Sequence, residues 1–294
     1  MIKRIAAVSL RFLKSRPYIP SHTKVLCNDL VPICYDNSDN SLQHLEVAMN
    51  WLKYAQDINQ DGGVSAGYCL KRGWLPSYPE TTGYIIPTFV DYCHFVNKEE
   101  YLRRAVKMAD WPLSIQLQNG AFQGGFINSS PKPIVFNTGQ VLQGLIRIGK
   151  ETKQKKYLGA SLKAANWLVR VQDEEGIWKR CTYNEIPHVY HTRVAWPLLA
   201  LYEVTTNGAH LRTATKNVRW ALSNQKGNGW FKNNVFDRKS DPFLHTIAYA
   251  IEELLECAIL ILNKAWLEAA MKPAEVLLRR LEVKSVLSGT YNNK

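Results

Sequence analysis

Hydrophobic positions along the chain predict two alternating kinds of helix between residues 42 and 282. One kind is amphipathic, with apolar residues at spacings of three and four, as in Leu158, Leu162 and Leu168. The other kind is apolar on most sides, which predicts a buried inner helix. The inner helices are expected at 84–96, 139–148, 194–204 and 247–262. The amphipathic helices form an outer set, and residues 266–282 are expected to add one more outer helix.

Three residue markers recur in phase with these helices. A Trp stands five residues before a Gln at Trp51, Trp111, Trp167 and Trp220, with intervals of 60, 56 and 53 residues (111−51, 167−111, 220−167). Thr82, Thr138, Thr192 and Thr246 open the inner helices, which we expect them to cap, and Gly63, Gly120, Gly176 and Gly229 follow the Gln. Alternating outer and inner hairpins predict an all-α fold, an α/α toroid with about four and a half hairpins.

Loop lengths indicate where a site would lie. Connections from an outer to the next inner helix are long, whereas the return connections are short, as at 97–99 and 205–208. The long loops span 63–80, 120–136, 176–190 and 229–244. Because successive helices alternate in direction, all four long loops emerge over the N-termini of the inner helices, a face that we name the inner mouth. Loops of this length are uncommon unless they are functional, so the inner mouth is the expected site.

The repeat resembles a known sequence family. Trp167-Leu168-x3-Gln172-x3-Gly176-x-Trp178, echoed by Trp220, Gln225 and Gly229-Trp230, is similar to the QW repeat of triterpene cyclases. The resemblance implies the α/α-toroid superfamily, which includes terpenoid cyclases, prenyltransferase β subunits and six-hairpin polysaccharide-active enzymes. Residues 73–84 and 245–249 also look like uncharacterised bacterial toroid proteins of polysaccharide gene clusters.

The sequence departs from that family in two respects. The cyclase acid motif D-x-D-D is absent, and the zinc ligands of prenyltransferases have no clear counterpart. A closed toroid uses about six hairpins, more than the four and a half found here. The resemblance therefore implies the fold and leaves the activity open.

The residues beside each Thr marker are the catalytic candidates at the inner mouth. They are His191, His245, Asn137, Tyr190, Arg193 and Glu80. In β-elimination or C5 epimerisation of a uronate, Asn137 or Arg193 would neutralise the carboxylate, and a His or Tyr190 would take the proton. In hydrolysis, Glu80 would act with Glu185 or Asp241. β-Elimination or epimerisation is slightly favoured over hydrolysis. For His191 and His245, a structural role in capping or loop packing is as well supported as a catalytic one.

Charge and aromatic residues in the loops predict the ligand. The net charge of +12 and pI near 9.4 favour an anionic partner, which we expect to be an acidic polysaccharide or oligosaccharide. The expected substrate-binding residues are Trp74, Tyr78, Tyr183, Arg72, Arg180 and Lys232.

Trp178 and Trp230, which recur at the same place in the repeat, are expected to be structural and to pack between outer helices. No motif supports nucleic-acid binding. A non-catalytic glycan-binding or assembly module and a terpenoid cyclase-like or prenyltransferase-like protein remain the alternatives.

The remaining features concern the N-terminus and the cysteines. Residues 1–41 are expected to form a basic helix and connector ahead of a toroid domain at 42–294. No segment is long and apolar enough for a membrane span, although peripheral membrane contact of the basic helix is left open, as is an oligomer. The six cysteines contain no C-x-x-C pair, which predicts reduced thiols, a cytoplasmic location and no metal or cofactor.

Overall fold

The computed structural model describes residues 22–25, 40–128 and 130–291. The chain divides into two compact units, Met1–Tyr78 and Pro79–Lys294. The first unit contains helix α3 (Ser41–Asp57) and an antiparallel pair of short strands, β1 (Tyr68–Cys69) and β2 (Gly73–Trp74). The helix predicted over the first residues lies outside the described part, and the predicted domain boundary at residue 41 stays a prediction.

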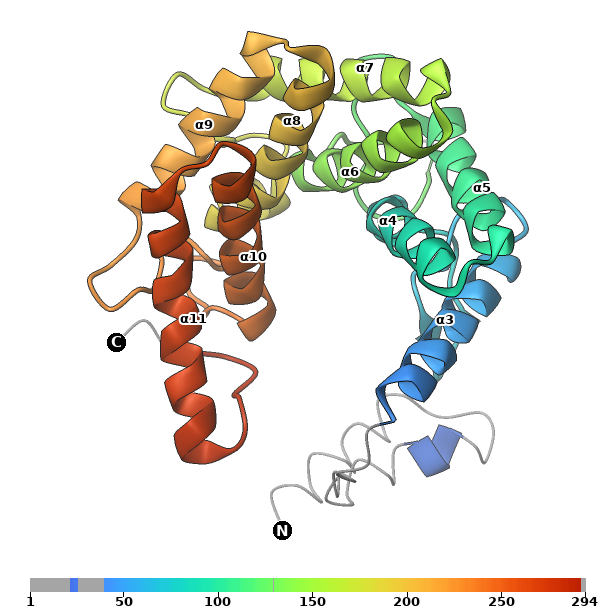
Figure 1. Cartoon of the computed structure of the whole chain (residues 1–294), viewed down its shortest axis with the longest axis horizontal. Coiled ribbons are helices and arrows are strands. Elements are labelled where there is room, and N and C mark those ends of the chain that lie inside the picture. Colours follow the sequence, from blue (N-terminus) through green and yellow to red (C-terminus); the bar gives the residue numbers. More distant parts are fainter. Residues whose placement is uncertain (1–21, 26–39, 129, 292–294) are drawn as a thin grey trace. The chain divides into compact units, whose positions relative to one another are not determined.

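The second unit alternates inner and outer helices (Figure 1). Its helices are α4 (Pro79–Val96), α5 (Glu99–Ile115), α6 (Val135–Thr152), α7 (Lys155–Val171), α8 (Thr192–Thr205), α9 (Gly208–Ser223), α10 (Leu244–Leu260) and α11 (Lys264–Lys284). Two short 3-10 turns, Tyr183–Glu185 and Val189–His191, precede α8. The inner helices α4, α6, α8 and α10 contact one another in chain order, and each forms a hairpin with the outer helix that follows it. The predicted all-α toroid arrangement is confirmed.

Glycine allows the inner helices to pack closely near their N-termini. A Cβ atom at Gly83 of α4 would lie 2.6 Å from the Gln140 carbonyl oxygen of α6. A Cβ atom at Gly139 of α6 would lie 2.8 Å from a methyl carbon of Val194 on α8. Both separations are shorter than van der Waals contact, so a larger residue would push the inner helices apart. The spacing of the side chains at the inner mouth depends on this close packing.

The repeated Gln joins neighbouring hairpins. The side-chain amide of Gln172 donates to the Gly176 carbonyl at 3.2 Å and to the Thr213 carbonyl of the next outer helix at 3.0 Å. Gln116 and Gln225 make the equivalent pairs of bonds, to Gly120 and Ala160 and to Gly229 and Ala269. The Gln and Gly markers of the sequence therefore mark the joint between one hairpin and the next.

The two repeat-locked Trp residues are structural, as predicted. Trp178 is fully buried, and its indole N–H donates to the Leu168 carbonyl at 3.0 Å. Trp230 is 4% exposed and stacks on Tyr291. Buried aromatic rings of this size contribute strongly to stability, and neither ring is available to a ligand.

Replacing Gln225 by Leu should destabilise the fold by about 1–3 kcal/mol. Proline has no backbone N–H, so Pro273 cannot donate to the Ala269 carbonyl four residues earlier, and Gln225 supplies that bond at 2.8 Å. The Leu variant leaves this carbonyl and that of Gly229 without the amide donor. Urea denaturation measures the loss. Gln118→Leu, at an exposed position, is the control, and equal stability of the two variants would contradict the prediction.

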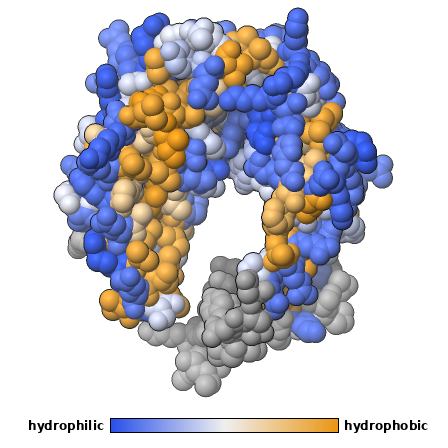
Figure 2. Space-filling model, viewed as in Figure 1, coloured by the Kyte–Doolittle hydropathy of each residue, from blue (hydrophilic) through white to orange (hydrophobic). Residues whose placement is uncertain are grey.

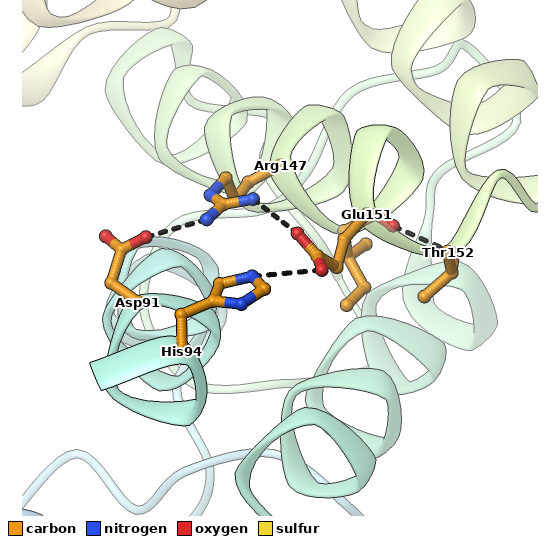
Figure 3. Close-up of polar contacts among 6 residues, drawn as sticks. Asp91, His94, Arg147, Glu151 and Thr152 are labelled. Carbon is orange, nitrogen blue, oxygen red and sulfur yellow. Dashed lines mark hydrogen bonds and ion pairs between the residues drawn. The ribbon is translucent and has the colours of Figure 1, made fainter. Parts of the chain in front are cut away.

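An ion-pair cluster joins the opposite, C-terminal ends of α4 and α6 (Figure 3). Arg147 of α6 donates to Asp91 of α4 at 2.7 Å and to Glu151 at 2.8 Å. His94 of α4 lies 3.0 Å from the other oxygen of Glu151. Although burial acts in the opposite direction, hydrogen bonds from His94 and Arg147 hold the pKa of Glu151 below its ordinary value.

This cluster predicts a pH dependence of stability. Because the folded-state pKa of Glu151 is depressed, its contribution is complete above the ordinary value of 4.5 and is lost as the pH falls through the lowered value. Arg147→Met should therefore flatten the decline in the free energy of unfolding below pH 4.5. Chemical denaturation at several acidic pH values measures the slope. An unchanged slope in the variant would show that Arg147 does not stabilise the ionised carboxylate.

The last hairpin exposes apolar side chains. Ile259, Leu262, Leu278 and Leu281 are 55%, 91%, 56% and 41% exposed. Figure 2 shows hydrophobic residues along α10 and α11, the arm on the left of the view.

In the part that the structure describes, no helix combines the length and apolar character that a membrane span needs. The described cysteines, Cys69, Cys93, Cys181 and Cys257, are free thiols.

Candidate functional site

The inner mouth brings together three polar side chains from three helices. Glu80, Asn137 and Arg193 occupy the first turns of α4, α6 and α8, because each stands at nearly the same place in the repeat.

The prediction that the Thr markers cap these helices is wrong for Thr138 and Thr246. They lie inside the first turn, and their hydroxyls bind loop backbone, as when Thr138 accepts from the Phe122 N–H at 3.0 Å. Thr138 and Thr246 therefore fasten two of the long loops to the inner helices, whereas the buried hydroxyl of Thr192 has no hydrogen-bond partner among the described residues.

Arg193 is held by partners within the protein. Its Nε donates to Gln140 at 2.8 Å, and its Nη1 donates to Glu253 and, at 3.3 Å, to Glu252. The guanidinium also lies over the rings of Tyr249 and Tyr84, 4.4 Å and 5.7 Å from their centroids. These contacts place a rigid positive charge at the centre of the site.

Glu80 has an unusual protonation equilibrium. Burial raises its pKa to about 7, even though the positive charge of Arg193 and the amide of Asn137 favour the ionised form. A carboxyl group with this pKa can both give and take a proton near neutral pH. Asn137 is 4% exposed, and among the described residues its Nδ2 has no partner with regular hydrogen-bond geometry.

Glu253 is a second buried carboxyl group of the site, and it was not among the residues predicted from the repeat. It is fully buried on α10, where burial raises its pKa and the paired guanidinium of Arg193 opposes that rise. The available signal was the charged pair Glu252-Glu253, followed by Glu256, within a mainly apolar inner helix. Two carboxyl groups with raised pKa values, Glu80 and Glu253, therefore share one arginine.

Aromatic rings line the site. Tyr190 stacks on His188 at 4.5 Å and meets Phe136 and Phe236 edge to face at 5.5 Å and 5.6 Å. Burial, and next the negative charge of Glu80, raise the pKa of Tyr190 well above its usual range, so its hydroxyl stays neutral. Phe136 also contacts Tyr249, the ring beneath Arg193. A neutral tyrosine and flat rings beside an acid suit a sugar-like ligand.

The two predicted catalytic histidines occupy different environments. His191 is 1% exposed and meets Trp178 edge to face, and neither ring nitrogen has a hydrogen-bond partner among the residues described. Burial, with a smaller contribution from His188, keeps its pKa well below the usual value. His245 is exposed and contacts Phe236 and Tyr249, the aromatic residues of the site. His245 therefore borders the inner mouth, whereas His191 packs in the core, and a catalytic role for either stays a prediction.

His188, which was not among the predicted site residues, joins two of the long loops. Its Nδ1 lies 2.8 Å from the Val235 carbonyl and its Nε2 lies 2.8 Å from the Tyr183 carbonyl. Carbonyl oxygens only accept, so this geometry favours a ring with both nitrogens protonated, while burial lowers the pKa. His188 positions the loop that carries Tyr190.

The predicted substrate-binding residues are distributed over both units. Arg72, Trp74 and Tyr78 belong to the first unit, where the Trp74 ring packs against Trp51 and Tyr54 at 4.9 Å and 5.4 Å. In the second unit Arg180 is exposed, and Tyr183 is 57% exposed and contacts Phe236 at 5.7 Å.

Lys232 lines a cleft of about 480 Å³ between two of the long loops. Arg238 lies in the same wall, and Ile186 and Pro187 line the cleft from the loop before α8. Glu185 and Asp241, the predicted carboxylate partners of Glu80 for hydrolysis, are both exposed. This cleft carries positive charge on the loop face of the second unit.

Solved structures share the fold at low sequence identity. A family 76 α-mannanase of Bacteroides thetaiotaomicron is 15% identical with a TM-score of 0.56, covering 69% of this chain and 58% of its own length. A cellobiose 2-epimerase of Bacillus thermoamylovorans is 11% identical with a TM-score of 0.66, covering 81% and 70%. An unsaturated glucuronyl hydrolase specific for heparin is 12% identical with a TM-score of 0.64, covering 81% and 67%. These similarities show a common fold, and the chain spans little more than half the length of the mannanase.

The family comparison confirms the superfamily that the repeat implies. No curated protein is significantly similar to the chain. The family model of the squalene-hopene cyclase C-terminal domain matches residues 76–256, which is more than half of the 294 residues. This segment contains Glu80, Asn137 and Arg193 together with the helices that position them. The protein belongs to the squalene-hopene cyclase C-terminal domain family, an α/α-toroid family.

Proposed function

We propose that the protein is a carbohydrate-active enzyme in which Glu80 transfers a proton at the inner mouth. The observation that carries the proposal is the position of Glu80, whose pKa is raised to about 7 beside Arg193 and Asn137. The partly exposed rings of Phe136, Phe236 and Tyr249 provide flat surfaces on which a sugar can stack. The mannanase, the epimerase and the glucuronyl hydrolase that share the fold are named for sugar substrates, which supports this class of ligand.

The substrate that we propose is an acidic, uronate-containing polysaccharide or oligosaccharide. Lys232 and Arg238 line the loop cleft, and two positive side chains in one wall attract a polyanion. The net charge of +12 acts in the same direction. Near Glu80 the charge is not predominantly positive, because the acidic residues Glu252 and Glu253 lie beside Arg193. We therefore place the chain of anionic sugars on the loops and one reacting sugar at Glu80.

The reaction that we propose removes a proton next to a carboxylate, as in β-elimination or C5 epimerisation. Glu80 takes the C5 proton, and the Asn137 amide and the neutral Tyr190 hydroxyl donate to the negative oxygen that develops. In elimination the C4–O bond then breaks and the departing oxygen takes the proton from Glu80. In epimerisation water returns a proton to the opposite face of C5. Arg193 acts through Glu80, because its own hydrogen bonds go to Gln140 and the two glutamates. Hydrolysis needs a second free carboxylate, and Glu253 is already paired with Arg193.

Terpenoid cyclisation is the second candidate, and the family match favours it. Protonating an alkene needs an acid much stronger than a carboxyl group with a pKa of about 7, which is the value for Glu80. The acid motif D-x-D-D is also absent from the chain. A non-catalytic glycan-binding module would use the same aromatic and basic surface without turnover. For these reasons we place proton transfer on a sugar first.

A panel of acidic and neutral polysaccharides tests the proposal. Absorbance of unsaturated uronates detects elimination, a reducing-end assay detects hydrolysis, and incorporation of solvent deuterium at C5 detects epimerisation. We expect a signal from the wild-type protein that Glu80→Gln loses and Glu203→Gln keeps, because Glu203 lies near the far end of α8. Glycan binding without any of the three signals would contradict catalysis and favour the binding module.

We also propose that the protein is located in the cytoplasm. A reducing compartment keeps thiols free, and the four described cysteines are free thiols. Cys27 and Cys34 lie outside the described residues. Labelling all six thiols in protein isolated without reductant tests the proposal, and unreactive cysteines that react only after reduction would contradict it.

A further inference from the structure

An apolar recess lies at the far end of the second unit, away from the inner mouth. It is a cavity of about 350 Å³ between the C-terminal ends of α6 and α8 and the beginning of α7, three neighbouring helices in Figure 1. Leu145 and Leu201 are fully buried at this cavity, and Leu158 and Val204 also line it. Its walls are mainly apolar, and its volume falls within the usual range for small-molecule sites.

Positive charge surrounds this apolar recess. Lys150, Lys153 and Lys155 line the cavity together with the leucines. Lys150 is paired with Glu203 at 3.4 Å, and Lys156 close by is paired with Asp110 at 2.5 Å. Lys153 and Lys155 have no ion-pair partner among the residues that the structure describes, and both are exposed. Two unpaired ammonium groups therefore stand at the edge of an apolar cavity.

We infer that this cavity binds a single-chain anionic amphiphile, an alkyl carboxylate. The alkyl chain would enter between Leu145, Leu158 and Leu201, where burial of apolar surface favours it. The carboxylate would remain at the rim, where Lys153 and Lys155 supply the opposite charge. Neither part of the ligand alone satisfies the site, because a free anion has no apolar surface to bury and a neutral chain gains nothing from the lysines. The inference is independent of the function proposed for Glu80.

Calorimetric titration of the full chain with decanoate, decan-1-ol and acetate tests the inference. We expect saturable binding of one decanoate per chain, no binding of acetate, and binding of decan-1-ol weaker than that of decanoate by roughly 3- to 10-fold. Acetate binding as tightly as decanoate would overturn the role of the cavity. Decan-1-ol binding as tightly as decanoate would overturn the role of the lysines.

Two variants locate the ligand, each with a matched control. Val204→Trp places an indole in the cavity mouth and should weaken decanoate binding at least about tenfold. Ile259→Trp, at a similarly exposed position of α10, should leave the binding unchanged.

The double variant Lys153→Asn, Lys155→Glu should weaken decanoate binding and leave decan-1-ol binding unchanged. Lys264→Glu is its control, because Lys264 opens α11 as Lys155 opens α7.

The outcome that contradicts the inference is equally specific. Decanoate affinity unchanged in Val204→Trp, measured on protein whose helical circular dichroism matches the wild type, would place the ligand elsewhere. Absence of decanoate binding together with binding to vesicles of anionic lipid would replace the cavity by a surface contact with a membrane. Because no readout depends on Glu80, these results leave the proposed enzymatic activity to its own test.

Discussion

Replacing Glu80 by Gln is expected to lower turnover on the sugar substrate by about 10²- to 10⁴-fold, the range for loss of a general acid or base. The amide keeps the size of the side chain and cannot exchange the proton. For a base, the wild-type rate should rise with pH through about 7, the pKa of Glu80, and for an acid it should fall. Initial rates across this range, for the wild type and for Glu203→Gln as control, give both the size and the direction of the effect.

The same substitution should make the folded protein more stable in alkaline solution. The folded pKa of Glu80, about 7, lies above the ordinary value of 4.5, so the wild type loses stability as the pH rises through the folded value. The shift corresponds to roughly 3 kcal/mol at high pH, and a neutral Gln avoids this cost. Below pH 4.5 the two proteins should be similar. Loss of activity with a lower stability at every pH would contradict a functional role and indicate damage to the fold.

Replacing Arg193 by Met should destabilise the protein by about 3–5 kcal/mol at neutral pH, the usual cost of leaving a buried ion-pair partner alone. Arg193 is 8% exposed, and Glu253 has no exposed surface and is paired with it. The variant should also raise the pKa of Glu80 further, because the guanidinium favours the ionised carboxylate. Urea denaturation and the pH dependence of the rate measure the two effects separately.

A double-mutant cycle isolates the ion pair. Glu253→Gln in the Arg193→Met background removes the carboxyl group that has lost its partner and should recover part of the lost stability. The coupling energy between the two sites should be well above the roughly 0.5 kcal/mol scatter of independent sites. Arg147→Met is the matched control, because its side chain is 30% exposed and its ion pairs should contribute much less. Additive effects of Arg193→Met and Glu253→Gln would show that the two groups are not energetically coupled.

The repeat made most of the fold predictable from sequence. Trp167, Gln172 and Gly176 recur because each hairpin meets the next through the same joint, and the Gln172 amide bonds to both sides of that joint. The same periodicity places Glu80, Asn137 and Arg193 at equivalent positions, so their convergence at the inner mouth follows from register. The spacing of residues within and between neighbouring repeats was sufficient to predict these features, because each repeat contacts the next one.

Features that depend on side-chain direction or on distant contacts could not be predicted. Successive helical residues point about 100° apart, so the register that turns Arg193 toward Glu253 turns His191 toward Trp178 in the core. Glu253 meets Arg193 across sixty positions of sequence, and no spacing rule connects an inner helix to a charge on the preceding one. The cleft at Lys232 arises between two irregular loops, for which periodicity carries no information.

The proposed function requires that Glu80 can exchange a proton at neutral pH. Carbon-13 NMR titration of its side chain tests this without a known substrate. Glutamate labelled at the carboxyl carbon, with the resonance assigned by its absence in Glu80→Gln, gives the midpoint directly. We expect a midpoint near 7. A midpoint at or below the ordinary value of 4.5 would show a permanently ionised carboxylate and would contradict the proposed role.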